Sequence, residues 1–183
     1  MKTTHETIEI RKMRLTDLKR VAEIEKEIFS VPWSEKGFAD SLKQDCTLYL
    51  TVLQDEEIIG YCGMFQSFDE ADITNVAVAE KSRGKGIATR MLTELMKRGE
   101  ARGIHAYTLE VREGNQPARH LYRKLGFEEA GIRKNFYEKP AENAVIMWKR
   151  GSDPIPRQTR QITWCSAGLF PDGTGIKFSA DRC

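Results

Sequence analysis

The stretch Val76-Ala77-Val78-Ala79-Glu80-Lys81-Ser82-Arg83-Gly84-Lys85-Gly86-Ile87-Ala88-Thr89-Arg90-Met91-Leu92 predicts a strand, a glycine-rich loop and the start of a helix in succession. Gly84 and Gly86 allow the chain to turn tightly and to approach a ligand closely. The backbone amides that open the following helix have no acceptor within the helix, and the helix dipole favours an anion in front of them. Arg83 and Lys85 add positive charge at the same place. The loop therefore predicts a phosphate-binding site, with an ordinary strand-to-helix turn as the alternative.

Length and composition limit what else the chain can be. Its 183 residues are enough for one domain with a sizeable core. The formal net charge is only +2 with 31% charged residues, so the overall basic character of nucleic-acid-binding proteins is missing. The longest apolar run is too short to cross a bilayer, and the start of the chain lacks the apolar core of a signal peptide. We therefore expect a cytoplasmic protein with no membrane partner and no direct nucleic-acid partner.

The cysteines and histidines are scattered along the chain. None stands at metal-ligand or redox spacing from another (Cys46, Cys62, Cys165, Cys183; His5, His105, His120). This spacing argues against a zinc site and against a disulfide framework, so we expect reduced thiols and no metal cofactor.

The segment before the loop predicts a strand, two helices and an antiparallel meander. Ser34 can cap the second helix, directly after a proline that disfavours continuation of the first. Polar connections of hairpin length separate the next three β-rich runs, which should therefore pair antiparallel. The expected elements are a strand at 8–10, a helix capped at Thr16 or Asp17, a helix after Ser34, and strands at 48–53, 58–65 and 72–78.

The segment from Ile87 onward predicts two helices and three strands. Apolar residues recur at helical spacing from Ile87, and Gly103 is suited to end that helix. The next strand, at 106–111, should run parallel to 72–78 because a helical crossover joins them. A helix capped by Asn115 and ended by Gly126, and strands at 128–133 and 143–149, complete the pattern.

These elements predict an α/β fold built on a mixed sheet of six to seven strands, with about four helices on its two faces. The expected order is β-α-α-β-β-β-α-β-α-β-β, and residues 1–150 should form this one domain. Residues 151–183 are predicted to be a C-terminal extension, because 151–156 is typical of a linker and no sustained period follows. We expect the extension to be poorly ordered, or to dock on the domain or on a partner.

Three features of this topology resemble the GNAT superfamily of acetyl-CoA-dependent N-acetyltransferases, whose pyrophosphate loop has the pattern Gln/Arg-x-x-Gly-x-Gly/Ala. The match covers about residues 8–149, well beyond a lone motif. The features are Arg83-x-x-Gly86-x-Ala88, the acidic residue of Leu109-Glu110-Val111-Arg112, and Asn115 followed by Leu121-Tyr122-x-x-Leu125-Gly126-Phe127.

A closer resemblance is to the bacterial ribosomal-protein-alanine N-acetyltransferases, the RimI family. Two departures are small: Ala88 stands where many relatives have a second glycine, and Phe136 where they often have tyrosine. The segments that carry the resemblance are Pro32-Trp33-Ser34, Thr74-Asn75-Val76-Ala77-Val78, Leu109-Glu110-Val111-Arg112, Asn115, Leu121-Tyr122 and Gly131-Ile132-Arg133-Lys134-Asn135-Phe136-Tyr137.

The resemblance implies acetyl-CoA as the cosubstrate and assigns residues to it. Val76, Ala77 and Val78 would pair with the pantetheine between two diverging strands, although plain sheet residues would look the same. Asn115 would contact the cofactor, with helix capping as a near-equal alternative. The loop residues that would hold the pyrophosphate are Arg83, Gly84, Lys85, Gly86, Ile87, Ala88 and Thr89.

The resemblance also implies a catalytic pair, Glu110 and Tyr122. An acetyl thioester is already activated, so an unprotonated amine can attack it directly, and an α-amine has a pKa of only about 8. Glu110 would then remove the amine's proton, acting through water, and Tyr122 would protonate the departing thiolate. Their alternatives are a solvated carboxylate at a strand end and a packing tyrosine. His120 could compete as an acid or base, but its helix neighbours suggest that it points elsewhere.

The acceptor implied by the resemblance is the N-terminal amine of a protein, the N-terminal alanine of a small-subunit ribosomal protein. Trp33 and Tyr137 would line its binding site, although Trp33 beside a proline is also typical of a packing residue. The alternatives are an acetyltransferase for another amine, such as a polyamine or a lysine, and a noncatalytic acetyl-CoA-binding module. The oligomeric state is not fixed by the sequence.

Overall fold

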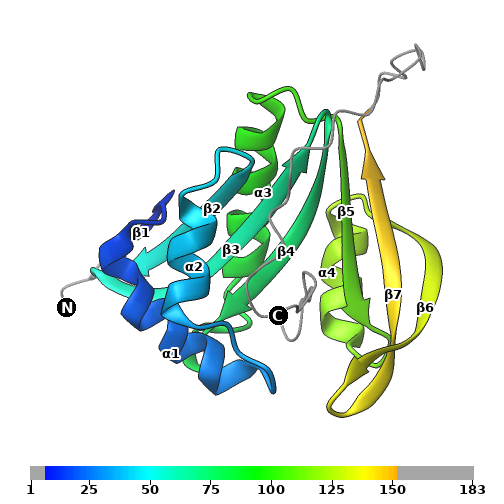
Figure 1. Ribbon diagram of the computed structural model, residues 1–183, viewed down its shortest axis with the longest axis horizontal. Helices are drawn as coiled ribbons and strands as arrows, with labels where there is room; N and C mark the ends of the chain where they lie inside the picture. The colour runs from blue at the N-terminus through cyan, green and yellow to red at the C-terminus, as the bar shows by residue number, and fades with distance from the viewer. Residues whose placement is uncertain (1–6, 152–183) are drawn as a thin grey trace, which may run out of the picture.

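The computed structural model describes residues 7–151, and in this range one seven-stranded sheet carries four α-helices (Figure 1). The sheet order is β1-β2-β3-β4-β5-β7-β6. The elements are β1 Ile8–Lys12, a 3₁₀ turn at Leu15–Asp17, α1 Leu18–Ile28, α2 Glu35–Leu42, β2 Thr47–Gln54, β3 Glu57–Ser67, β4 Glu70–Val78, a 3₁₀ turn at Glu80–Ser82, α3 Ile87–Glu100, β5 Ala106–Arg112, α4 Gln116–Lys124, β6 Glu128–Glu138 and β7 Ala141–Arg150. The predicted α/β class and element order are confirmed, whereas the extension predicted at 151–183 lies outside the described residues beyond Gly151.

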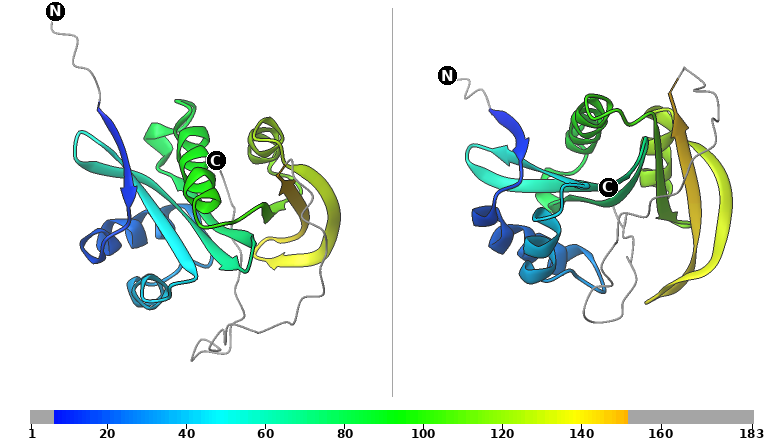
Figure 2. Two further views of the ribbon diagram at one scale, coloured as in Figure 1. Left: turned by 90° about the horizontal axis from the view of Figure 1, so that it is seen from above. Right: turned by 45° about the horizontal axis from the view of Figure 1, so that its top comes forward.

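The helices cover the two faces of the sheet separately (Figure 2). One core lies under α3 and α4 and includes Met91, Leu95 and Tyr122, and the other lies under α1 and α2 and includes Ile24 and Phe38. Alternate residues of the central strands serve the two cores, because successive side chains of a strand point to opposite faces. None of the helices in the described range is long and apolar enough to cross a membrane.

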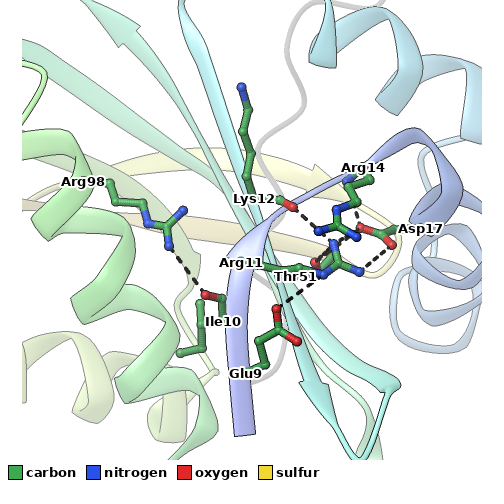
Figure 3. A network of polar contacts seen from close by, with 8 residues as sticks. All are labelled: Glu9, Ile10, Arg11, Lys12, Arg14, Asp17, Thr51 and Arg98. Carbon is green, nitrogen blue, oxygen red and sulfur yellow. Dashed lines mark hydrogen bonds and ion pairs between the residues drawn. The ribbon is translucent and has the colours of Figure 1, made fainter.

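Asp17 ties the first strand to the start of α1 (Figure 3). Its carboxylate accepts hydrogen bonds at 2.7 and 2.9 Å from the guanidinium of Arg11, and one at 2.8 Å from the backbone N–H of Arg14. Burial opposes ionisation, but these hydrogen bonds outweigh it and lower the pKa of Asp17. Asp17 stands at the predicted cap position, yet its side chain makes no capping hydrogen bond to α1 because Arg11 and Arg14 engage it.

A buried polar network supports the middle of β4. Asn75 donates to the carboxylate of Glu25 on α1 at 3.2 Å, and the hydroxyl of Tyr61 donates to the same oxygen. Tyr49 donates to Asn75 at 3.4 Å. The network adjoins a β-bulge at Thr74, where β4 carries one residue more than β3 between its paired positions. A bulge of this kind bends the strand that carries it.

The largest difference from the predicted boundaries is in the last hairpin. β6 continues to Glu138, five residues beyond the predicted end, because it resumes pairing after an irregularity between Arg133 and Tyr137. Asn135 has a φ of 53° inside this irregularity, a conformation that asparagine tolerates better than most residues. Cys46 is half-buried and Cys62 is buried, whereas Cys165 and Cys183 lie outside the described residues.

Candidate active site

β4 and β5 pair only at their N-terminal ends and then diverge. The parallel register joins Glu70 with Ala106, Ala71 with Tyr107 and Asp72 with Thr108, and no later pair is formed within residues 7–151. Figure 1 shows the two strands together at one end and separated at the other, where their C-terminal ends lie. Such an opening at the carboxyl ends of parallel strands is a common place for a ligand.

The glycine-rich loop lies at the open end, between β4 and α3. It borders a cavity of about 180 Å³ lined by Val78, Ser82, Arg83, Gly84, Gly86, Ile87, Ala88, Thr89, Pro117 and Leu121. Gly84 and Gly86 have φ values of 74° and 73°, which L side chains rarely adopt, and a Cβ on either would meet no atom within 4 Å. Both glycines therefore serve backbone conformation and leave the space in front of α3 open to a ligand.

The loop's two cations differ in position. Arg83 lines the cavity and donates from Nε to the carbonyl of Val78 at 3.0 Å, so its side chain also holds the end of β4. Lys85 lines a second hollow of about 230 Å³ together with Lys81 and Glu57. Val76 and Ala77 pair with β3 through Cys62 and Tyr61 and are not lining residues of the first cavity.

Asn115 caps α4 with its side-chain oxygen, and its side-chain nitrogen takes no part in the cap. Its Oδ1 accepts a hydrogen bond from the backbone N–H of Ala118 at 3.2 Å, as predicted for an N-cap. Its Nδ2 is buried and has no hydrogen-bond partner within the described part of the chain. A buried donor left without a partner is costly, so this amide is free to bind a ligand atom. Pro117, in the first turn of the same helix, lines the cavity.

Glu110 lies on β5 beyond the last β4–β5 pair and is only 8% exposed. Its Oε1 lies 2.6 Å from Nη1 of Arg133, which reaches it from β6 across β7. Burial raises the pKa of Glu110, Arg133 lowers it and Asp72 raises it, and the net shift is upward. A raised pKa makes this carboxylate a stronger proton acceptor than an ordinary glutamate.

Asp72 lies at the point where the strands separate, on the same face of the sheet as Glu110. Its neighbours Ala71 and Ile73, like Leu109 on β5, belong to the core under α3, so the alternation of strand side chains turns both carboxylates to the opposite face. Burial and the charge of Glu70 raise the pKa of Asp72 to about 6. Asp72 was not predicted as a site residue from the sequence, although an acidic residue between two apolar ones in a strand was the available signal.

Tyr122 is fully buried in the core beneath α4, with its ring against that of Phe127 at a centroid distance of 5.9 Å. It is absent from the cavity's lining residues, whereas Leu121, its neighbour in the chain, is among them. The structure therefore brings the helix of Tyr122 to the cavity, and the ring of Tyr122 is buried.

Trp33 lies in the loop between α1 and α2, and Tyr137 lies on β6. Trp33 directly precedes the Ser34 cap of α2, and its ring centroid lies 5.4 Å from that of Phe38 in the first turns of the helix. This contact is a hydrophobic staple. Tyr137 is 7% exposed, its hydroxyl donates to the carbonyl of Glu110 at 3.4 Å, and the guanidinium of Arg112 lies 4.0 Å from its ring centroid. Of the two residues predicted to bind the acceptor substrate, Tyr137 is thus the one that contacts Glu110, through the backbone carbonyl.

A hydrogen bond joins the segments that bear Trp33 and Tyr137. Ser30, which follows α1, donates to the carbonyl of Lys139 in the β6–β7 turn at 2.7 Å. Arg133 lies on β6 in the same region, and no role was predicted for it from the sequence. A strand exposed along most of its length gives no signal of a partner two strands away.

Within residues 7–151, no group of three or more His, Cys, Asp or Glu could hold a metal ion.

Comparison with known proteins identifies the type of site. The family model described as the acetyltransferase (GNAT) family matches residues 18–127. The ribosomal protein bS18-alanine N-acetyltransferase of Haemophilus influenzae (strain ATCC 51907 / DSM 11121 / KW20 / Rd) is 37% identical over 141 residues, which cover 75% of this chain and 95% of that protein. A Bacillus subtilis (strain 168) protein that carries the same name provisionally is 40% identical over 143 residues, 76% of this chain and 93% of that one.

A solved structure agrees with the sequence relatives. The crystal structure of the ribosomal-protein-S18-alanine N-acetyltransferase from Escherichia coli has a TM-score of 0.75 and 32% sequence identity to this chain. The match covers 83% of this chain and 99% of that one. The range 18–127 that the family model matches includes the diverging strands, the glycine-rich loop and both predicted catalytic residues.

Proposed function

The chain belongs to the GNAT family of acetyltransferases, and we propose that it transfers the acetyl group of acetyl-CoA to the N-terminal alanine of ribosomal protein bS18. That it is an N-acetyltransferase follows from the family, and GNAT enzymes use acetyl-CoA. The named acceptor rests on what the relatives from H. influenzae and E. coli are called. A cytoplasmic site of action is part of this proposal, because ribosomal proteins are made there.

The residues present fit acetyl-CoA in two respects. Positive φ at Gly84 and Gly86, with open space where a Cβ would lie, makes a cradle that a pyrophosphate can enter. The Nδ2 of Asn115, which has no partner among residues 7–151, is a buried donor at the start of α4, and Pro117 of that helix lines the same cavity. We propose that Arg83 to Thr89 hold the pyrophosphate and that Asn115 and the backbone of Val76 to Val78 hold the pantetheine.

Acetyl-CoA, when bound, supplies an activated thioester, so the protein needs no nucleophilic serine or cysteine of its own. We propose that Glu110 accepts the proton of the acceptor's α-ammonium, through a water molecule, at its carboxylate. We propose that Tyr122 donates its hydroxyl proton to the sulfur of the departing coenzyme A. Trp33 and Tyr137 would border the acceptor peptide, and the hydrogen bond from Tyr137 would steady the strand that carries Glu110.

The observation that carries the proposal is the place of Glu110. A carboxylate that is 8% exposed, has a raised pKa and stands just beyond the last β4–β5 pair suits a base for an amine in the opening. A noncatalytic acetyl-CoA-binding module would need the cradle but no such group. Proton transfer of this kind is worth about 10²–10⁴-fold in rate.

The test is an acetyl-transfer assay on a panel of acceptors, with released coenzyme A measured and the modified position located by mass spectrometry. The panel holds a peptide with the N-terminal sequence of bS18, the same peptide blocked at its α-amine, a lysine-containing peptide with a blocked N-terminus, and polyamines. Acetylation of the free α-amine alone is expected. Turnover confined to lysine or polyamine would refute the proposed acceptor, and no turnover on any amine would refute the catalytic role.

A further inference from the structure

The ion pair between Arg133 and Glu110 affects how a positively charged acceptor can bind. An N-terminal α-amine arrives as an ammonium ion near neutral pH, since its pKa is about 8. Glu110 is the base proposed for it, but the charge of Glu110 already faces the guanidinium of Arg133 at 2.6 Å. The charge of Glu110 is already balanced by Arg133, so placing the acceptor's ammonium beside the same carboxylate leaves one positive charge unbalanced. In a partly buried site an unbalanced charge costs free energy.

A second carboxylate stands where it can meet that cation. Asp72 shares the sheet face of Glu110, and its register partner Thr108 lies two residues before Glu110 on β5. Two residues of a strand span about 6.6 Å, so an ammonium group can lie between the two carboxylates. Within residues 7–151 no cation lies at ion-pair distance from Asp72, and the charged residues that act on its ionisation are acidic.

We propose that Asp72 supplies the negative charge that balances the acceptor's ammonium group, because Arg133 already balances Glu110. The inference rests on the proposed function and names a further acceptor-binding residue at that site. Asp72, Glu110 and Arg133 form a row of charged side chains across the sheet. Before the acceptor binds, this row holds two carboxylates and one guanidinium. With the acceptor bound it holds two negative and two positive charges, so neither Arg133 nor Glu110 has to change partner.

The ionisation of Asp72 is consistent with this role. Its pKa of about 6 leaves it ionised at pH 7 to 8, where the α-amine still carries its proton part of the time. Burial makes that charge costly in the free protein, and a cation arriving beside it offsets the cost. Selection of a positively charged acceptor follows from the same balance, because a neutral group in that place would leave Asp72 uncompensated.

The experiment compares Asp72→Asn with Glu70→Gln in the full-length protein. Both remove one negative charge from β4, but Glu70 is exposed and lies two register positions further from Glu110. With an alanine-started peptide at saturating acetyl-CoA and pH 8, we expect Asp72→Asn to raise the peptide KM about five- to twentyfold. The kcat and the KM for acetyl-CoA should stay within about twofold, and Asp72→Glu should restore most of the loss.

A binding measurement separates charge from chemistry. Two unreactive peptides are titrated in the presence of coenzyme A, one with a trimethylated, permanently charged N-terminus and one with the neutral carbon isostere. The wild type should prefer the charged peptide, and Asp72→Asn should lose that preference. Equal behaviour of Asp72→Asn and Glu70→Gln would overturn the inference alone, as would a parallel rise in the KM for acetyl-CoA. A wild-type protein that acetylates no α-amine would overturn the proposed function and the inference together.

Discussion

Arg133 reaches across β7 to place its Nη1 2.6 Å from Oε1 of Glu110, and the two side chains differ sharply in exposure, 52% against 10%. The register explains the reach: Arg133 pairs with Ala144 on β7, and Ala144 pairs with Arg112, two residues beyond Glu110 on β5. A buried carboxylate thus depends on an exposed cation from the edge strand. Because the partner is exposed, its charge can be altered without opening the core.

Glu110→Gln tests the base directly. The amide has nearly the same shape but cannot accept the amine's proton, so kcat should fall about 10²–10⁴-fold at neutral pH. The acetyl-CoA Kd, measured by calorimetry, should change little, because Glu110 is not a lining residue of the glycine-loop cavity. Glu128→Gln, an exposed position on β6, is the matched control. Unchanged turnover in Glu110→Gln would remove it from the mechanism.

Arg133→Gln should shift the pH dependence of the reaction. Arg133 lowers the pKa of Glu110, so its loss should raise that pKa further. A base works only when deprotonated, and the acid limb of kcat/KM should therefore move to higher pH. Arg133→Lys keeps the charge and should move the limb less. A shift toward lower pH, or none, would show that the pair seen here does not govern the active carboxyl.

Asp72→Asn should stabilise the fold at neutral pH while harming acceptor binding. The folded-state pKa of Asp72 is about 6 against an ordinary value of 3.8, so the folded protein binds the proton more tightly than the unfolded chain. Stability therefore falls as pH rises from about 4 to 6, and the penalty persists above 6. Asn carries no such penalty, and a gain of about 1–3 kcal/mol at pH 8 is expected.

Denaturant unfolding at a series of pH values measures this gain. The difference between Asp72→Asn and wild type should vanish below about pH 3, where Asp72 is protonated in both states. Glu70 contributes to the shift by its charge, so Glu70→Gln should show a smaller gain of the same sign, and Glu110 and Arg133 are the other charged groups in the row. A destabilised Asp72→Asn at pH 8 would contradict the assigned cost.

Most of the fold could be predicted from local signals. Alternation of apolar residues, caps at Ser34 and Asn115 and the helical spacing after Ile87 each marked an element that the structure contains. The end of β6 could not be predicted, because its later residues rejoin β7 after an irregularity. Pairing partners far apart in sequence decide such a boundary, and local propensity does not report them.

The candidate site divides in the same way. The glycine-rich loop is continuous in sequence, so its cradle was visible as a motif. The row of Asp72, Glu110 and Arg133 joins three strands whose order in the sheet is set by the crossover and the final hairpin. The resemblance to a known family pointed to Glu110, but its two charged neighbours appear only once the register is known.

Gly86→Ala separates the cradle's conformation from its contact with ligand, because Gly103 offers a matched control. Both glycines have positive φ, 73° and 81°, and a Cβ on either would meet nothing within 4 Å. Each alanine should therefore cost about 1–2 kcal/mol of stability. Only Gly86 borders the cavity, so only Gly86→Ala should also weaken acetyl-CoA binding in calorimetry. Equal acetyl-CoA affinity in the two variants would refute the cradle.

Asn115 performs two roles that substitution can separate, since its Oδ1 caps α4 while its Nδ2 has no partner among the described residues. Ser keeps a capping oxygen and loses the amide donor, whereas Ala loses both. Asn115→Ser should weaken acetyl-CoA binding about five- to thirtyfold with little change in Tm. Asn115→Ala should show the same loss of affinity and a lower Tm, because α4 also loses its cap. If Asn115→Ser binds acetyl-CoA like wild type, capping is the whole role of Asn115, and the buried Nδ2 has no ligand to meet.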